Sequence, residues 1–67
     1  MSNHLVHRDE LIRKIRKMTK QPVLALELHT MLCQQGYKGF EVTAAISHGC
    51  TYGKLALEGN DWYVRAL

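Results

Sequence analysis

The chain has 67 residues, of which 46% are hydrophobic and 22% charged, and its formal net charge is +3. This length leaves no room for a second domain, and the hydrophobic content excludes a disordered chain. No apolar run approaches the roughly 18 residues needed to span a bilayer, and the first residues lack the apolar stretch of a secretory signal. We therefore expect one cytoplasmic domain over residues 1–67, in which residues 1–7 are flexible.

The first predicted helix covers about residues 8–19, where apolar residues recur at the spacing of one helical face. Six basic and two acidic residues lie between positions 8 and 20, a local charge of +4, and the basic ones fall largely outside the apolar stripe. This basic outer surface could dock a phosphate backbone or an acidic protein. The stripe is formed by Leu11, Ile12, Ile15 and Met18. The basic docking surface consists of Arg13, Lys14, Arg16 and Lys17.

A second helix is predicted over residues 22–35. Pro22 fits its first position, because the N–H that proline lacks has no intrahelical partner there. Gly36 follows as the residue best able to end a helix in the left-handed conformation. Further apolar residues widen the stripe, so we expect this to be the central helix of the core. The stripe is formed by Leu24, Leu28, Met31 and Leu32.

A third helix is predicted over residues 40–49, after a short turn at residues 36–39 that begins and ends with glycine. Its apolar face is formed by Val42, Ala45, Ile46 and Gly49. The opposite face carries only small or neutral polar side chains, which are Ala44, Ser47, His48 and Thr51.

Beyond residue 53 the period changes from helical to alternating, which is typical of a β-hairpin. A two-residue loop at Gly59-Asn60 fits this segment, because tight hairpin loops favour that dipeptide. In this register the larger apolar residues share one face, and Trp62 anchors the hairpin on the core. The pairs on that face are Leu57 with Trp62 and Leu55 with Val64. The pairs on the other face are Ala56 with Tyr63 and Lys54 with Arg65.

These elements predict an α+β fold of three helices followed by a C-terminal two-stranded β-hairpin. The element order, Gly36 between the second and third helices, and the terminal run GKLALEGNDWYV over residues 53–64 resemble the winged helix-turn-helix DNA-binding domain. The resemblance covers nearly the whole chain. It implies that the helix at 40–49 is a recognition helix and that Gly59-Asn60 forms the tip of a wing.

The resemblance also implies a set of contact residues. In relatives that bind DNA, the recognition helix enters the major groove while the wing and nearby basic groups contact phosphates. The third helix lacks Arg, Lys, Asn and Gln, the side chains that recognise base edges most strongly. Glu58 and Asp61 at the wing tip would repel phosphate. The implied base contacts are Thr43, Ala44, Ser47, His48, Thr51 and Tyr52. The implied phosphate contacts are Lys38, Lys54 and Arg65.

We expect a small regulator without catalytic activity, whose partner is double-stranded DNA. The alternative is a protein–protein interaction module that binds and modulates an acidic or nucleic-acid-handling protein. The neutral face of the third helix permits close approach by such a partner, and His48 and Tyr52 are side chains that interfaces favour. Self-association into a homodimer through the first helix is a third use of the same basic surface. Salt-dependent affinity for DNA separates the first two hypotheses.

Catalytic and metal sites find little support. Cys33 and Cys50 are expected to be free thiols that behave as small hydrophobes. His29 and Cys33 share a helix face, and His48 lies near Cys50, but the spacing of these four residues differs from that of familiar zinc fingers. Nothing in the sequence builds an oxyanion site for a nucleophilic cysteine. We expect no catalytic residues, no metal and no cofactor.

Overall fold

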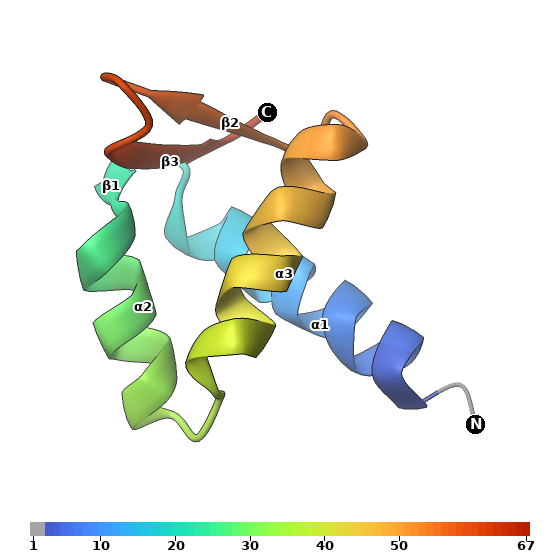
Figure 1. Ribbon diagram of the computed structural model, residues 1–67. Coiled ribbons are helices and arrows are strands. Elements are labelled where there is room, and N and C mark those ends of the chain that lie inside the picture. Colours follow the sequence, from blue (N-terminus) through green and yellow to red (C-terminus); the bar gives the residue numbers. More distant parts are fainter. Residues whose placement is uncertain (1–2) are drawn as a thin grey trace.

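The computed structural model describes the backbone of residues 3–67 and the side chains from residue 8 onward (Figure 1). Three helices and a small three-stranded antiparallel sheet confirm the predicted α+β class. The expected flexible segment concerns residues 1–7, of which residues 1–2 and all seven side chains lie outside the described part. No described helix is long and apolar enough to cross a membrane. In chain order the elements are α1 (Asn3–Met18), β1 (Val23–Leu24), α2 (Ala25–Gln34), α3 (Gly39–Thr51), β2 (Leu55–Glu58) and β3 (Tyr63–Ala66).

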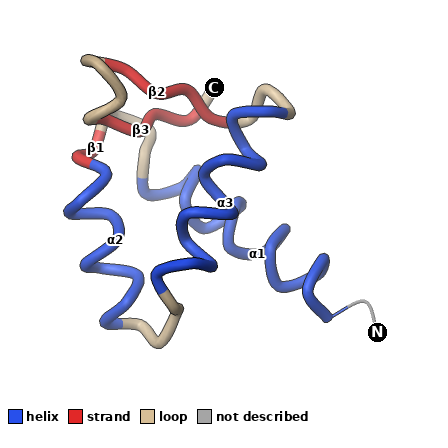
Figure 2. Tube along the Cα trace, in the orientation of Figure 1, coloured by secondary structure: helices blue, strands red, loops and turns tan. Residues whose placement is uncertain are grey.

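The sheet lies across one end of the helices, where α1 and α3 end and α2 begins (Figures 1 and 2). α3 lies between the other two helices and packs against α1, α2 and β2. The strand order is β1-β3-β2, so β3 is the central strand. α3 is thus held from three sides, and one side of it is left for solvent.

The predicted apolar stripes of all three helices meet in the core. Thr19 is also fully buried, and its hydroxyl donates a 2.8 Å hydrogen bond to the carbonyl oxygen of Ile15. Three predicted members of the stripes differ, since Met18 and Leu24 are only partly buried and Met31 is exposed. The buried apolar side chains are Leu11, Ile12, Ile15, Leu28, Leu32, Val42, Ala45, Ile46, Leu55 and Val64.

The predicted start of the second helix at Pro22 is wrong. Val23 and Leu24 instead form β1, in which Val23 pairs with Val64 of β3, and α2 begins at Ala25. The Ala25 N–H donates a 2.8 Å hydrogen bond to the carbonyl oxygen of Trp62, so the first free donor of α2 is satisfied by the hairpin. Pairing with a strand 40 residues away therefore overrides the local preference of proline for a first helical position.

The predicted hairpin is present, but its register is shifted by two residues. Leu57 pairs with Val64 rather than with Trp62, and the loop has four residues, 59–62, rather than two. Gly59, Asn60 and Asp61 all have positive φ, a conformation that glycine, asparagine and aspartate tolerate best. Because side chains alternate with a period of two, the shift leaves the predicted faces of the strands unchanged. It moves Trp62 out of the strand and leaves its side chain 65% exposed, so the predicted anchoring of Trp62 on the core is wrong.

A close approach of helix and strand fixes the position of the hairpin on α3. Gly49 is buried in α3, and the side chain of Leu55 in β2 lies directly on it. A Cβ atom at position 49 would lie 2.6 Å from Cδ1 of Leu55. The missing side chain of Gly49 therefore makes room for Leu55.

Candidate nucleic-acid interface

The residues implied as base contacts separate onto two flanks of α3. Thr43, Ser47 and Thr51 line a pocket of about 400 Å³ between α2, α3 and the hairpin, together with His29 and Asp61. No Lys or Arg is among the described residues that line this pocket, and the Thr51 hydroxyl donates to the carbonyl oxygen of Ser47. This flank is therefore neutral to acidic, which does not favour a phosphate backbone.

The second flank of α3 carries aromatic side chains. Phe40 is 70% exposed and Tyr52 is 65% exposed, and the rings of His48 and Tyr52 are in contact, with centroids 4.4 Å apart. Ala44 is also exposed and lies one helical turn from Phe40 and from His48. We refer to Phe40, Ala44, His48 and Tyr52, which follow one another at intervals of four residues, as the aromatic ridge.

Basic side chains from α1 and from the turn after α3 converge on two further pockets. Arg13, Arg16 and Lys54 line a pocket of about 330 Å³ with Ile12 and Asp9. A second pocket of about 440 Å³ shares both arginines, adds Lys17 and Lys20, and reaches Ala66 at the end of β3 and Leu67 after it. The Nη2 group of Arg16 donates a 2.9 Å hydrogen bond to the carbonyl oxygen of Leu67, which orients the guanidinium. We define the basic surface as Arg13, Arg16, Lys17, Lys20 and Lys54.

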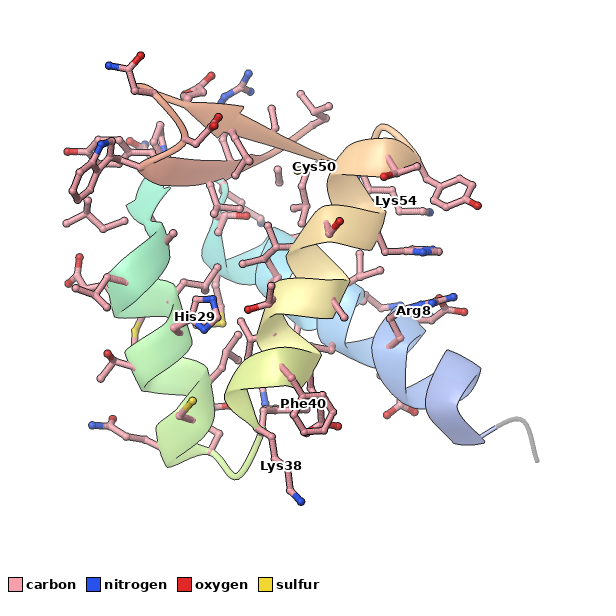
Figure 3. The ribbon with its side chains drawn as sticks, viewed as in Figure 1. Arg8, His29, Lys38, Phe40, Cys50 and Lys54 are labelled. Atoms are coloured by element: carbon pink, nitrogen blue, oxygen red, sulfur yellow. The ribbon has the colours of Figure 1, made fainter. Side chains whose placement is uncertain are left out.

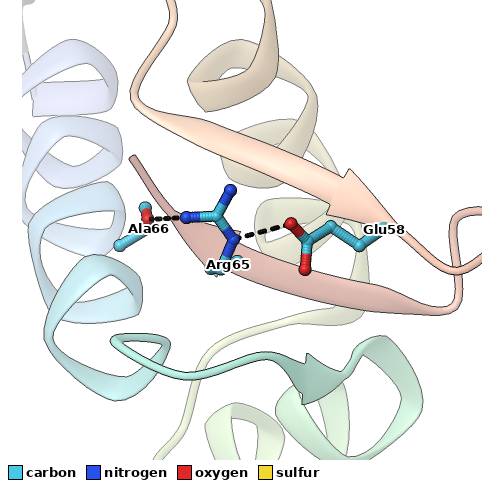
Figure 4. Close-up of polar contacts among 3 residues, drawn as sticks. All are labelled: Glu58, Arg65 and Ala66. Carbon is cyan, nitrogen blue, oxygen red and sulfur yellow. Dashed lines mark hydrogen bonds and ion pairs between the residues drawn. The ribbon is translucent and has the colours of Figure 1, made fainter.

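Three other cations named from the sequence lie elsewhere. Lys38 is at the N-terminal end of α3, opposite the end that leads to Lys54 (Figure 3). The Lys14 ammonium lies 5.4 Å from the centre of the Tyr37 ring, a cation–π contact. Arg65 forms an ion pair with Glu58, with 2.7 Å between Nε and Oε2, and it also donates to the carbonyl oxygen of Ala66 (Figure 4). The structure thus groups Lys54 with α1 and not with the wing.

Two members of this interface were missed in the sequence. Phe40 was placed at the start of the third helix but not among the contact residues, although it precedes Ala44 and His48 at four-residue intervals and lies off the apolar stripe. Lys20 was counted in the basic segment but not in the docking surface. The wall that it shares with Arg16 is completed by Leu67, and no local pattern reveals that contact.

Of the four residues considered as zinc ligands, His29 and Cys50 line the same pocket, whereas Cys33 and His48 do not line it. Among residues 8–67, no three His, Cys, Asp or Glu side chains gather in an arrangement that could hold a metal ion. Cys33 is exposed on α2, contrary to the expectation that it packs as a small hydrophobe, while Cys50 is partly buried against the core. Burial raises the pKa of the Cys50 thiol, and the negative charge of Asp61 raises it further.

We expect the two thiols to react at different rates. At pH 8 iodoacetamide should alkylate Cys33 several-fold faster than Cys50, because Cys33 is exposed and the raised pKa of Cys50 lowers its thiolate fraction. Peptide mass spectrometry over a time course measures both rates. Asp61→Asn should quicken the alkylation of Cys50 alone, since it removes a charge that disfavours the thiolate. Equal rates at the two cysteines in the unmodified chain would contradict this prediction.

No known protein family, curated protein or solved structure gives a significant match to this chain.

Proposed function

We propose that this chain is a small winged helix-turn-helix protein that binds nucleic acid, with phosphate contacts made by the basic surface. The fold assignment is supported by the four-residue connection, residues 35–38, that joins α2 to α3 and contains Gly36, as in helix-turn-helix motifs. The hairpin that follows α3 corresponds to the wing. Duplex DNA is the partner that this resemblance implies.

The observation that carries the proposal is the convergence of five cations from two separate parts of the chain. Four of them come from α1 and the residues after it, and Lys54 comes from the turn between α3 and β2. Asp9 is the one carboxylate among the described side chains that line the two pockets, and none of the five cations forms an ion pair within residues 8–67. Such a surface attracts phosphates, which dominate the affinity of nucleic-acid binding.

This assignment changes the source of the phosphate contacts. The carboxylate of Glu58 partly offsets the charge of Arg65 on the outer face of the hairpin. Lys38 precedes α3 and Lys54 follows it, so the helix separates them by its length of about 20 Å. Neither Arg65 nor Lys38 is among the residues that line the two basic pockets. We therefore expect Arg13, Lys17 and Lys54 to contribute more to the affinity for DNA than Arg65 in the wing does.

Two charge variants of equal net charge test the proposal. One changes Arg13, Lys17 and Lys54 to Gln, and the matched control changes Lys14, Lys38 and Arg65 to Gln. Fluorescence anisotropy with a random 20-base-pair duplex is measured between about 50 and 200 mM salt. Each lost phosphate contact lowers the slope of log K against log salt by roughly 1, so the first variant should lose about 3 and the control almost nothing.

The two variants also separate a defined surface from net charge alone. An equal decrease of the salt slope in both variants would mean that binding depends on the net charge alone. The basic surface would then not be the site of the phosphate contacts. If the unmodified chain shows no detectable binding at either salt concentration, duplex DNA is not the partner.

A protein partner is the second candidate, and exposed apolar side chains beside the hairpin loop favour it. Leu26 at the start of α2 is 75% exposed, and the main-chain hydrogen bond between Ala25 and Trp62 joins the start of α2 to the loop that carries the exposed Trp62. Leu57 is also exposed and lines the neutral pocket next to them. Exposed apolar residues on neighbouring segments are typical of interaction sites. If the titration detects no binding to DNA, a protein partner becomes the favoured function.

A further inference from the structure

The chemistry of the aromatic ridge suits the faces of bases better than their edges. Base edges in a duplex are recognised by hydrogen bonds, most strongly from Arg, Lys, Asn and Gln, and α3 contains none of these residues. The ridge presents instead the rings of Phe40, His48 and Tyr52. Aromatic rings stack on base faces whatever the sequence, and those faces are covered by neighbouring bases in a duplex.

We propose that the aromatic ridge stacks unpaired bases of a single strand while the basic surface holds the phosphates of the same strand. This inference rests on the proposed function, and it names the form of nucleic acid that the site prefers. A positively charged track beside exposed aromatic side chains is the arrangement that binds single strands without sequence preference.

The ridge and the basic surface meet at the C-terminal end of α3. The N–H of Tyr52 donates to the carbonyl oxygen of His48, and the N–H of Lys54 donates over 2.7 Å to that of Gly49, so both residues belong to the turn that ends α3. Figure 3 shows Lys54 and Arg8 extending to the same side of α3. The buried Nε of Arg8 has no hydrogen-bond partner in the described structure. Lys54, which lines a basic pocket with Arg13 and Arg16, therefore follows Tyr52 by two residues at the C-terminal end of α3.

The size and rigidity of the ridge suit more than one base. Phe40 and Tyr52 are twelve residues apart, which corresponds to about 18 Å along a helix. The contact between the His48 and Tyr52 rings holds Tyr52 in place while most of its surface stays open to solvent. No core residue has to move for a base to stack there. One acidic residue, Glu41, lies on the helix near Phe40, and its carboxylate accepts a hydrogen bond from the Lys38 N–H.

The experiment compares a labelled 12-nucleotide thymidine strand with a 12-base-pair duplex by fluorescence anisotropy at the same salt concentration. The unmodified chain should bind the single strand about tenfold more tightly than the duplex, because stacking contributes roughly 1–3 kcal/mol per base. Tyr52→Leu should weaken single-strand binding about tenfold and leave duplex binding unchanged, whereas Tyr52→Phe should keep the affinity. Trp62→Leu is the matched control, since Trp62 has the same exposed fraction as Tyr52 but lies on the hairpin loop.

The outcomes separate this inference from the proposed function. Duplex binding at least as tight as single-strand binding would overturn the inference alone, as would an equal loss from Tyr52→Leu and Trp62→Leu. Binding to neither probe would overturn the proposed function and the inference with it. Thermal melts by circular dichroism should match for all variants, because each replaced side chain is largely exposed.

Discussion

Replacing Leu28 by Ala should lower the free energy of unfolding by about 3 kcal/mol, which is most of what a domain of this length has. Leu28 is fully buried in α2. Its truncation removes the transfer free energy of the lost methyl and methylene groups and leaves a cavity that the three packed helices cannot close completely. Because a chain of 67 residues buries a smaller fraction of its surface than a larger domain does, little stability remains to absorb the loss.

Urea denaturation followed by circular dichroism measures this effect. Leu26→Ala is the matched control, since the same atoms are removed from the same helix at a side chain that faces solvent. We expect the control to change the free energy of unfolding by less than about 0.5 kcal/mol. Similar losses for both variants would show that Leu28 is not in the core.

Gly49→Ala should destabilise the protein by up to about 2 kcal/mol, although alanine is the better helix former. The helix preference alone would stabilise α3 by about 1 kcal/mol. The added Cβ would meet Cδ1 of Leu55 at 2.6 Å and Cγ at 2.8 Å, and Leu55 is itself buried and cannot turn into solvent. Overpacking of this kind costs roughly 1–3 kcal/mol and displaces β2 from α3. The clash therefore outweighs the preference.

A second glycine in the same helix provides the comparison. Gly39 begins α3, and a Cβ atom there would meet nothing within 4 Å. Gly39→Ala should leave the urea midpoint unchanged or raise it slightly. If Gly49→Ala raises the midpoint as well, Leu55 adapts to the added methyl and the close packing of helix and strand has no energetic consequence.

The three helices could be predicted from the sequence because each carries an apolar stripe of its own, most of which is buried. Ile15, Leu32 and Ala45 are buried where the periodicity places them. Short-range information is sufficient for such elements. The boundaries of the helices were less accurate, since α1 begins earlier than the predicted residue 8 and α3 continues to Thr51.

β1 could not be found in this way. Two residues, Val23 and Leu24, are too few for an alternating pattern, and they become a strand only by pairing with β3. The hairpin register failed for a related reason. A four-residue loop and a two-residue loop place Leu55, Leu57 and Val64 on the same face, so the apolar pattern could not distinguish them.

The candidate site shows the same division between local and distant information. Arg13 and Arg16 were identified from the charge of one helix, and Lys54 was identified from its place beside the implied wing. Their meeting in one pocket depends on how α1 packs against the end of α3, which the spacing of residues within either segment does not encode. The exposure of Phe40 likewise follows from the direction in which α3 packs, and not from its apolar character.

β3, the central strand, also determines how the molecule opens. Because β1, β2 and the segment after α1 all bond to this one strand, fraying of its end would release contacts to three parts of the chain at once. The sheet, the end of α1 and the basic surface are therefore connected. Displacement of β3 would also displace Leu67, whose main chain bonds both Arg16 and Lys54. Hydrogen bonds and strand pairing connect residues 16–25 with residues 62–67. They join Arg16 to Leu67, Thr19 to Ala66, Val23 to Val64 and Ala25 to Trp62.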